Sequence, residues 1–147
     1  MLKIAIDSGQ SGAIVLSQKG KVWTYNCPAT QAEVIDLVTS VAGLARGDGV
    51  EISAVIEKVH SMPGMNCAAL WKFSANYATW QCALIANKIP FKEVPPQQWM
   101  KALGNLPKEK KARKNCIKDQ MQKRFPDLKV TLANADALAL LSVWDKL

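Results

Sequence analysis

The chain has few of the side chains that bind soft or borderline metal ions. It contains one histidine, His60, and four cysteines, and no two of these cysteines stand in a Cys-x-x-Cys spacing. A structural zinc site is therefore not expected. Free, partly buried thiols in a reducing compartment are the simpler interpretation of the cysteines.

Two further absences narrow the class of protein. No apolar run approaches the roughly 18 residues of a membrane span, and the first residues do not combine a basic segment, an apolar stretch and a small-residue cleavage site. We therefore expect a protein without membrane contact, in the cytoplasm of a bacterium or of a phage-infected cell. The phosphate loop Gly-x-x-x-x-Gly-Lys-Ser/Thr is also missing, which argues against a P-loop nucleotidase.

Positive charge is present in excess and is concentrated in one segment. The 147 residues carry a formal net charge of +7 and fit a single domain, residues 1–147. Residues 101–129 hold ten Lys and Arg against three acids, and the other nine basic and nine acidic residues balance. Such a segment favours a polyanionic partner, most simply nucleic acid, although a solvated basic helix face is an equal alternative.

Apolar periodicity predicts strands separated by helices. We expect strands at 2–6, 12–18, 21–26, 51–57 and 91–94. The first three form an antiparallel meander. A capping box, Thr30-x-x-Glu33, begins a helix whose apolar residues recur at Val34, Leu37, Val38, Val41 and Leu44. Further helices are expected at about 68–87, briefly after 95, at about 107–125 and from Asn134 to the end. This order predicts an α/β fold: a mixed five-stranded sheet flanked by helices on both faces.

Three carboxylates stand where a sheet would bring them together. Asp7 and Glu57 each end an apolar strand, and Asp136 lies in the first turn of the last predicted helix, on an apolar face with Leu132, Leu140 and Val143. Functional groups gather at the carboxyl ends of parallel strands. Each close pair of ionised carboxylates costs roughly 4 kcal/mol at ~4 Å and an effective dielectric constant near 20. A Mg²⁺ or Mn²⁺ ion would remove that cost.

Each carboxylate also has a simpler explanation. Asp7 could accept hydrogen bonds from turn amides, as Asp in an Asp-x-Gly turn does. Glu57 could pair with Lys58 or Lys72. Asp136 could be an ordinary acid at a helix N-terminus.

Three segments together carry a family resemblance: "IAIDSGQSGAIV", "AVIEKVHSMPGM" and "NADALALL". In this order and spacing they resemble the RuvC-type Holliday junction resolvases, particularly their small phage-borne branch. The resemblance covers most of the chain and implies an RNase H-like fold. The segment Asp-x-Gly-x-Ser-Gly also resembles the phosphate loop of actin-like ATPases, but those need two such domains, for which 147 residues are too few.

The resemblance implies a homodimeric, Mg²⁺-dependent endonuclease acting in DNA recombination and repair. Such an enzyme binds four-way DNA junctions and makes paired nicks that leave 5′-phosphate and 3′-hydroxyl ends. Carried over by position, Asp7 would bridge two metal ions, Glu57 would hold the one near the leaving group, and Asp136 would complete the set. Mn²⁺ is expected to substitute for Mg²⁺.

One position departs from the family pattern. The family often has a second acid one helical turn before the last one, and here that position is Ala133. Asn134 is adjacent, but on a regular helix only positions three or four before Asp136 share its face. Two alternatives therefore stay open: another RNase H-like nuclease acting on branched DNA or RNA–DNA hybrids, and a protein that binds junctions without cutting them.

Basic residues are the candidates for DNA contact. The resemblance places active-site lysines near Lys101 and Lys110, where one could stabilise charge on the scissile phosphate. Phosphate contacts supply affinity without reading sequence. The further DNA-binding candidates are Lys58, His60, Met62, Lys72, Lys108, Lys111 and Lys114. In related enzymes an aromatic residue that stacks on an opened base stands at the position of His60. The aromatic residues Trp71, Phe73, Tyr77 and Trp80 are more consistent with helix core or a dimer interface than with base stacking.

Overall fold

Strand β1 (Leu2–Asp7) lies at the centre of a five-stranded sheet in the order β3-β2-β1-β4-β5. The computed structural model describes residues 1–9, 11–58, 64 and 66–147. The other strands are β2 (Ala13–Gln18), β3 (Lys21–Asn26), β4 (Ile52–Glu57) and β5 (Phe91–Val94). β1, β2 and β3 form an antiparallel meander, whereas β4 pairs in parallel with both β1 and β5. The predicted mixed sheet is confirmed.

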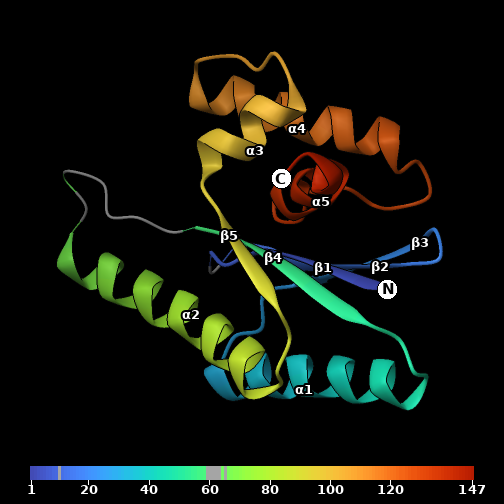
Figure 1. The fold of residues 1–147 in the computed structure, drawn as a ribbon. Coiled ribbons are helices and arrows are strands. Elements are labelled where there is room, and N and C mark those ends of the chain that lie inside the picture. The colour runs from blue at the N-terminus through green and yellow to red at the C-terminus, as the bar shows by residue number, and fades with distance from the viewer. Residues whose placement is uncertain (10, 59–63, 65) are drawn as a thin grey trace.

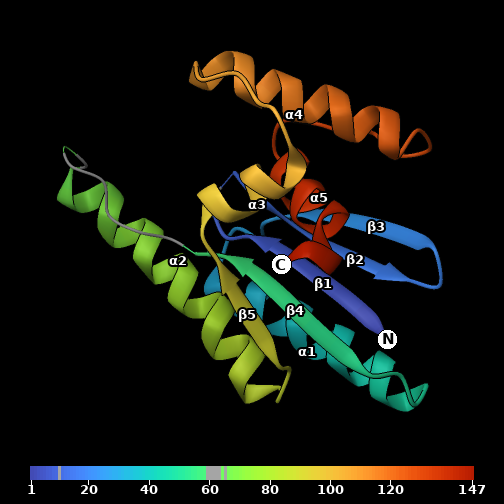
Figure 2. The same ribbon diagram turned by 45° about the horizontal axis from the view of Figure 1, so that its top comes forward.

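The helices form a layer on each face of the sheet (Figures 1 and 2). α1 (Gln31–Gly47) and α2 (Cys67–Ala86) cover one face. α3 (Pro96–Leu103), α4 (Lys110–Arg124) and α5 (Ala135–Ser142) lie on the other, and α4 is the outermost of these three. A short 3₁₀ helix, Trp144–Lys146, follows α5. Among the described residues, no helix is long and apolar enough to cross a membrane.

The central strands are apolar on both sides because both faces are covered. Ile4 and Ile6 of β1 face the layer of α1 and α2, where Trp80 and Leu84 are fully buried. Ala5 faces the other layer, where Trp99 and Leu138 are fully buried. Two separate hydrophobic clusters therefore hold the two helical layers against one sheet.

Local sequence signals explain several helix ends. Thr30 and Glu33 form the predicted capping box of α1, with Thr30 Oγ1 accepting from the Glu33 amide at 3.2 Å. The Glu109 side chain caps α4 by accepting from the amides of Lys111 and Ala112. Buried Ile117 and Met121 fix the strongly basic α4 to the rest of the layer.

Some details of the sequence prediction are wrong. Leu44 follows the apolar spacing of α1 but is 73% exposed. The last helix does not run to the end of the chain, since α5 ends at Ser142 and only a 3₁₀ turn follows. Leu132 is 51% exposed and precedes α5, so it does not share an apolar face with Leu140 and Val143, which are buried.

Candidate active site

Two of the three carboxylates meet because neighbouring strands are parallel. In the β1–β4 pairing Ile6 lies opposite Ile56, so Asp7 and Glu57 end adjacent strands at the same sheet edge. Asp136 is in the first turn of α5, which packs over β1 and β2. All three side chains line one pocket of about 610 Å³. The structure thus brings together the three acids that the sequence singled out.

Gly9 and Gly12, in the loop after β1, lie close to Asp7. The Gly9 amide donates to Asp7 Oδ1 at 3.2 Å, and the Gly12 amide donates to the Gly9 carbonyl at 2.9 Å. A Cβ on Gly12 would stand 2.2 Å from the Asp7 carbonyl oxygen and 2.8 Å from its Cγ. Only glycine fits at this position, because any side chain would displace the carboxylate. The turn-amide alternative for Asp7 therefore holds for one carboxylate oxygen without excluding a further role.

A contact from α2 fixes the same loop. Asn76 Nδ2 donates to the Ser8 carbonyl at 2.6 Å and lies 3.5 Å from Cys27 Sγ at the end of β3. Asn76 thereby ties α2 to the residue that follows Asp7. The sequence gives no signal for this contact, because an asparagine within a helix is usually a solvent-facing residue.

Glu57 is held by a buried tryptophan rather than by a lysine. Trp99 of α3 is fully buried, and its Nε1 donates to Glu57 Oε2 at 2.9 Å. Within the described part of the chain, Glu57 forms no ion pair with Lys58 or Lys72, which corrects that alternative. A buried indole N–H needs an acceptor, and here the acceptor is the carboxylate. Trp99 was not among the predicted site residues.

The residues before Asp136 form a turn rather than a helix. α5 begins at Ala135, and Asn134 is a buried N-cap residue whose Oδ1 accepts from the Thr131 amide at 2.8 Å. Ala133 therefore does not lie one regular helical turn before Asp136, contrary to the sequence interpretation. Asn134 is occupied in fixing this turn, since its Nδ2 also donates to the Lys129 carbonyl.

Burial raises the pKa values of all three acids, and repulsion from neighbouring carboxylates raises those of Glu57 and Asp136 further. Burial, then the charges of Asp7 and Asp136, raise the pKa of Glu57 to about 8. Burial and the charge of Asp7 raise the pKa of Asp136 to about 6, and burial raises the pKa of Asp7. The Lys114 ammonium acts in the opposite direction on each acid. The pocket is therefore short of positive charge when all three acids are ionised, as acidic sites that take up a cation are.

The donor set fits a hard divalent cation in its chemistry. Carboxylate oxygens are the ligands that Mg²⁺ and Mn²⁺ prefer, and no histidine or cysteine is among the described residues that line the pocket. The positions of the side chains fit such an ion less well than their chemistry does. Among the residues described, no three His, Cys, Asp or Glu side chains are grouped closely enough to hold a metal ion. The acids influence one another without forming a ready-made three-ligand cage.

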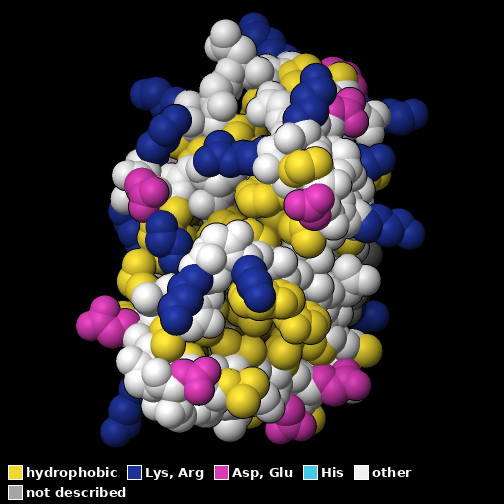
Figure 3. Space-filling view, turned by 90° about the vertical axis from the view of Figure 1, so that its right-hand side faces the viewer, with side chains coloured by type: hydrophobic (Ala, Val, Ile, Leu, Met, Phe, Trp, Pro, Cys, Tyr) yellow, Lys and Arg dark blue, Asp and Glu magenta, His cyan; other side chains and the backbone are white. Residues whose placement is uncertain are grey.

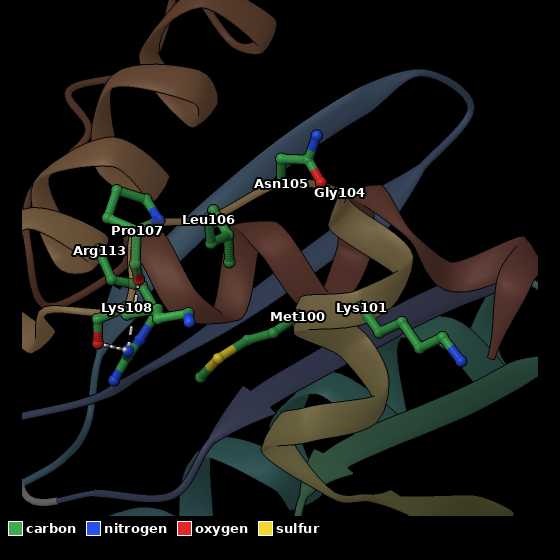
Figure 4. A pocket seen from close by; sticks show the side chains of 8 residues that line it. All are labelled: Met100, Lys101, Gly104, Asn105, Leu106, Pro107, Lys108 and Arg113. Carbon is green, nitrogen blue, oxygen red and sulfur yellow. Dashed lines mark hydrogen bonds between the residues drawn. The ribbon is translucent and has the colours of Figure 1, made fainter.

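Cationic side chains lie around the acids, and only some of the predicted basic residues are among them. The pocket is lined by Lys58, Lys110, Arg113 and Lys114. Lys101 does not line it: Figure 4 shows its side chain pointing away from Met100 and Arg113, because successive helix residues point in different directions. An active-site role for Lys101 is therefore not supported. Arg113 was not predicted, because the sequence does not show which basic residues of α4 point toward the pocket.

The remaining predicted DNA-binding residues lie at varying distances from the pocket. Lys108 lines a neighbouring hollow, Lys111 is exposed on α4, and Lys72 of α2 lines a separate hollow with Pro28 and Trp71. His60 and Met62 lie outside the described residues. Figure 3 shows Lys and Arg side chains projecting around the upper part of one face of the molecule, the side of the sheet on which α4 lies.

The aromatic residues of α2 divide between core, pocket and surface. Trp80 is fully buried and Tyr77 packs beside the same cluster, as predicted for core residues. Phe73 instead lines the carboxylate pocket, and Trp71 is 78% exposed. Trp71 is therefore not a core residue, and the dimer interface that was the other predicted role stays a prediction for it.

Comparison with solved structures identifies the fold. No family model and no curated protein sequence matches the chain. Two structures of RuvC from Thermus thermophilus match over 99% of this chain, each with a TM-score of 0.58. One is a complex with a Holliday junction substrate, with 14% sequence identity and 95% of its chain covered. The other shares 16% identity with 96% covered. The chain thus has the RNase H-like fold of RuvC, which confirms the fold that the sequence resemblance implied.

Proposed function

We propose that this protein is a metal-dependent endonuclease that cuts branched DNA, with four-way junctions as its principal substrate. The observation that carries the proposal is the pocket itself. Three partly buried carboxylates, from the ends of β1 and β4 and the start of α5, line one pocket beneath a basic helix, and burial and the charge of Asp7 raise the pKa values of Glu57 and Asp136. The shared fold supports the substrate class, since the Thermus thermophilus protein of that fold is found in complex with a Holliday junction.

Asp7, Glu57 and Asp136 would hold the metal, and we propose two Mg²⁺ ions with Mn²⁺ as a substitute. When bound, such ions activate water for attack on a phosphodiester and stabilise the departing 3′-oxyanion. Burial and then repulsion from Asp7 and Asp136 raise the pKa of Glu57 to about 8, and bringing cations to the pocket would relieve that repulsion. The products would carry 5′-phosphate and 3′-hydroxyl ends.

The protein's own residues orient the acids and receive the phosphate. The Trp99 indole fixes one Glu57 oxygen, and the Gly9 amide fixes one Asp7 oxygen. Lys110 and Lys114 line the same pocket from α4, where they would neutralise charge on the scissile phosphate. Lys58, the residue that follows Glu57 and β4, also lines this pocket.

We propose that the active form is a homodimer. A four-way junction offers two equivalent strands to cut, and a two-fold symmetric enzyme would present one carboxylate pocket to each. This part of the proposal is tested by sedimentation of the protein alone and bound to a junction.

A junction-binding protein that does not cut is the second candidate. Two observations favour it: the described residues contain no closed three-ligand group, and alanine occupies position 133. Basic residues around the pocket would bind DNA equally well in either case.

A nicking assay distinguishes these candidates. Synthetic four-way junctions, flaps, RNA–DNA hybrids and a duplex control are incubated with the protein in Mg²⁺ and, separately, in Mn²⁺. Paired nicks in the junction that DNA ligase can seal are the expected result. Preferred cutting of flaps or hybrids would indicate a different RNase H-like nuclease. Tight junction binding without nicks in either metal would establish the second candidate.

A further inference from the structure

A second hollow adjoins the carboxylate pocket and shares Met100 and Arg113 with it. It has a volume of about 600 Å³ and lies where the chain passes from α3 to α4 (Figure 4). We call it the α3–α4 hollow. Its lining residues are Met100, Lys101, Gly104, Asn105, Leu106, Pro107, Lys108 and Arg113. Because the two hollows share these two residues, they are direct neighbours.

The α3–α4 hollow is positively charged. Lys101, Lys108 and Arg113 line it, and no Asp or Glu is among the lining residues that the structure describes. The nearest acid in sequence, Glu109, is engaged in capping α4, with its oxygens 2.8 and 2.6 Å from the amides of Lys111 and Ala112. The one ion pair found in the described part of the chain joins Lys3 to Asp145, so these cations are not neutralised there. The chemistry calls for an anionic ligand.

Arg113 is oriented by the wall of the hollow. Its Nη1 donates to the Lys108 carbonyl at 2.8 Å and reaches the Pro107 carbonyl at 3.5 Å, as the dashed lines in Figure 4 show. The other guanidinium nitrogens donate to no group among the described residues. Arginine binds phosphate through two parallel N–H groups, and prior orientation lowers the entropic cost of doing so. Arg113 also lies near enough to Asp136 to lower its pKa.

Apart from the polar Asn105, the remaining walls are apolar, and two of their residues are fixed by packing. Met100 and Leu106 pack against the cluster that contains Trp99, so this part of the hollow exists before any ligand arrives. Gly104 ends α3 with a φ of +120°, a conformation that side-chain-bearing residues rarely adopt. No atom of the described residues stands within 4 Å of where its Cβ would be, so glycine serves the turn of the backbone rather than close packing. Apolar walls beside cations suit a nucleotide, whose sugar and base are less polar than its phosphate.

We propose that the α3–α4 hollow is a nucleotide subsite for the DNA strand being cut. It takes the nucleotide next to the scissile phosphodiester, with Arg113 binding the flanking phosphate and Lys108 beside it, while the sugar lies against Met100 and Leu106. The proposal rests on the proposed function, because the carboxylate pocket defines which phosphate is scissile. Its consequence is that the strand is held on both sides of Arg113 and cannot slide along the carboxylates.

Neutral DNA linkages provide the test. Junctions are prepared with a single uncharged methylphosphonate linkage, moved one position at a time along the strand at the branch point. Binding is measured by fluorescence anisotropy in an Asp7→Asn background, so that cutting does not interfere. We expect one linkage beside the scissile position to weaken binding about tenfold, the loss expected for a charge-assisted hydrogen bond.

Arg113→Lys keeps the charge and removes the paired N–H groups. This variant should bind the unmodified junction about tenfold more weakly and lose little more at the sensitive linkage. Lys123→Ala is the matched control, since Lys123 is exposed on α4 and lines neither hollow. It should weaken all junctions equally and keep the full tenfold sensitivity. Thermal unfolding of each variant separates loss of contact from loss of structure.

The outcomes separate this proposal from the proposed function. If Arg113→Lys keeps the same sensitivity as the control, or if no flanking linkage matters, the subsite is overturned even when the wild type cuts junctions. If the sensitivity disappears in Arg113→Lys but the wild type never nicks DNA, the hollow is a phosphate-binding site at Arg113 and the nuclease proposal fails. Failure to bind junctions at all would overturn both.

Discussion

Replacing Glu57 by glutamine should stabilise the metal-free protein at alkaline pH. The folded-state pKa of Glu57 is about 8, against an ordinary value of 4.5. Between these values the folded protein keeps a proton that the unfolded chain has released, so stability falls as the pH rises through this window. Below pH 4.5 both states are protonated, and the penalty is absent.

The size of the effect follows from the pKa shift. The full shift corresponds to roughly 5 kcal/mol, because one pKa unit is worth about 1.4 kcal/mol. Glu57 keeps part of its side chain in solvent, and screening there reduces the effect to about 2–3 kcal/mol. Glutamine keeps an oxygen that can accept the Trp99 N–H, so the substitution removes charge while preserving that contact.

Urea unfolding followed by tryptophan fluorescence at pH 4, 6.5 and 9, with chelator present, measures this effect. We expect Glu57→Gln to match the wild type at pH 4 and to exceed its free energy of unfolding by about 2–3 kcal/mol at pH 9. Glu51→Gln, at an exposed position just before β4, is the control and should change little at any pH. Equal stability of Glu57→Gln and the wild type at pH 4 and at pH 9 would refute a repulsive acidic pocket.

Magnesium extends the same experiment. A ligand at a hundred times its Kd stabilises the folded state by about 2.7 kcal/mol. Mg²⁺ at pH 8 should therefore raise the unfolding midpoint of the wild type and raise that of Glu57→Gln much less. An identical response in the two proteins would place any bound Mg²⁺ away from Glu57.

Two further substitutions test how the acids are held. Trp99→Phe removes the indole N–H that donates to Glu57. An NMR titration should then give a pKa of Glu57 above about 8, and the protein should lose about 1–3 kcal/mol of stability. An unchanged pKa of Glu57 would contradict this contact. Gly12→Ala places a Cβ 2.2 Å from the Asp7 carbonyl oxygen and should destabilise the protein by more than about 2 kcal/mol in urea unfolding, whereas Gly43→Ala, which meets no atom within 4 Å on α1, should stabilise it by roughly 0.5–1 kcal/mol.

The fold was predictable because its signals are local and repeated. Nearly continuous apolar runs marked β1 and β4, and the pair Thr30 and Glu33 marked the start of α1. Parallel pairing of β1 and β4 then followed from the intervening helix, and it places Asp7 and Glu57 at one edge. The order of strands and helices along the chain was therefore enough to predict that Asp7 and Glu57 lie close together.

The supporting contacts were not predictable, because each joins segments far apart in the chain. Trp99 reaches Glu57 across 42 positions, and Asn76 reaches Ser8 across 68. The prediction for Lys101 failed for a different reason, whereas Lys58, Lys110 and Lys114 do line the pocket. Lys101 and Arg113 are both basic residues on helices, and only the rotation of each helix against the sheet decides which one lines the pocket.

The most direct measurement is the nicking rate of a labelled four-way junction in Mg²⁺, compared between the wild type and Asp7→Asn. Asp7 lies in the shared pocket, and its charge raises the pKa values of both other acids. We expect paired, ligatable nicks from the wild type, and no nicks from Asp7→Asn despite junction binding at least as tight. Cutting by Asp7→Asn at the wild-type rate would show that the chemistry happens somewhere other than at these carboxylates.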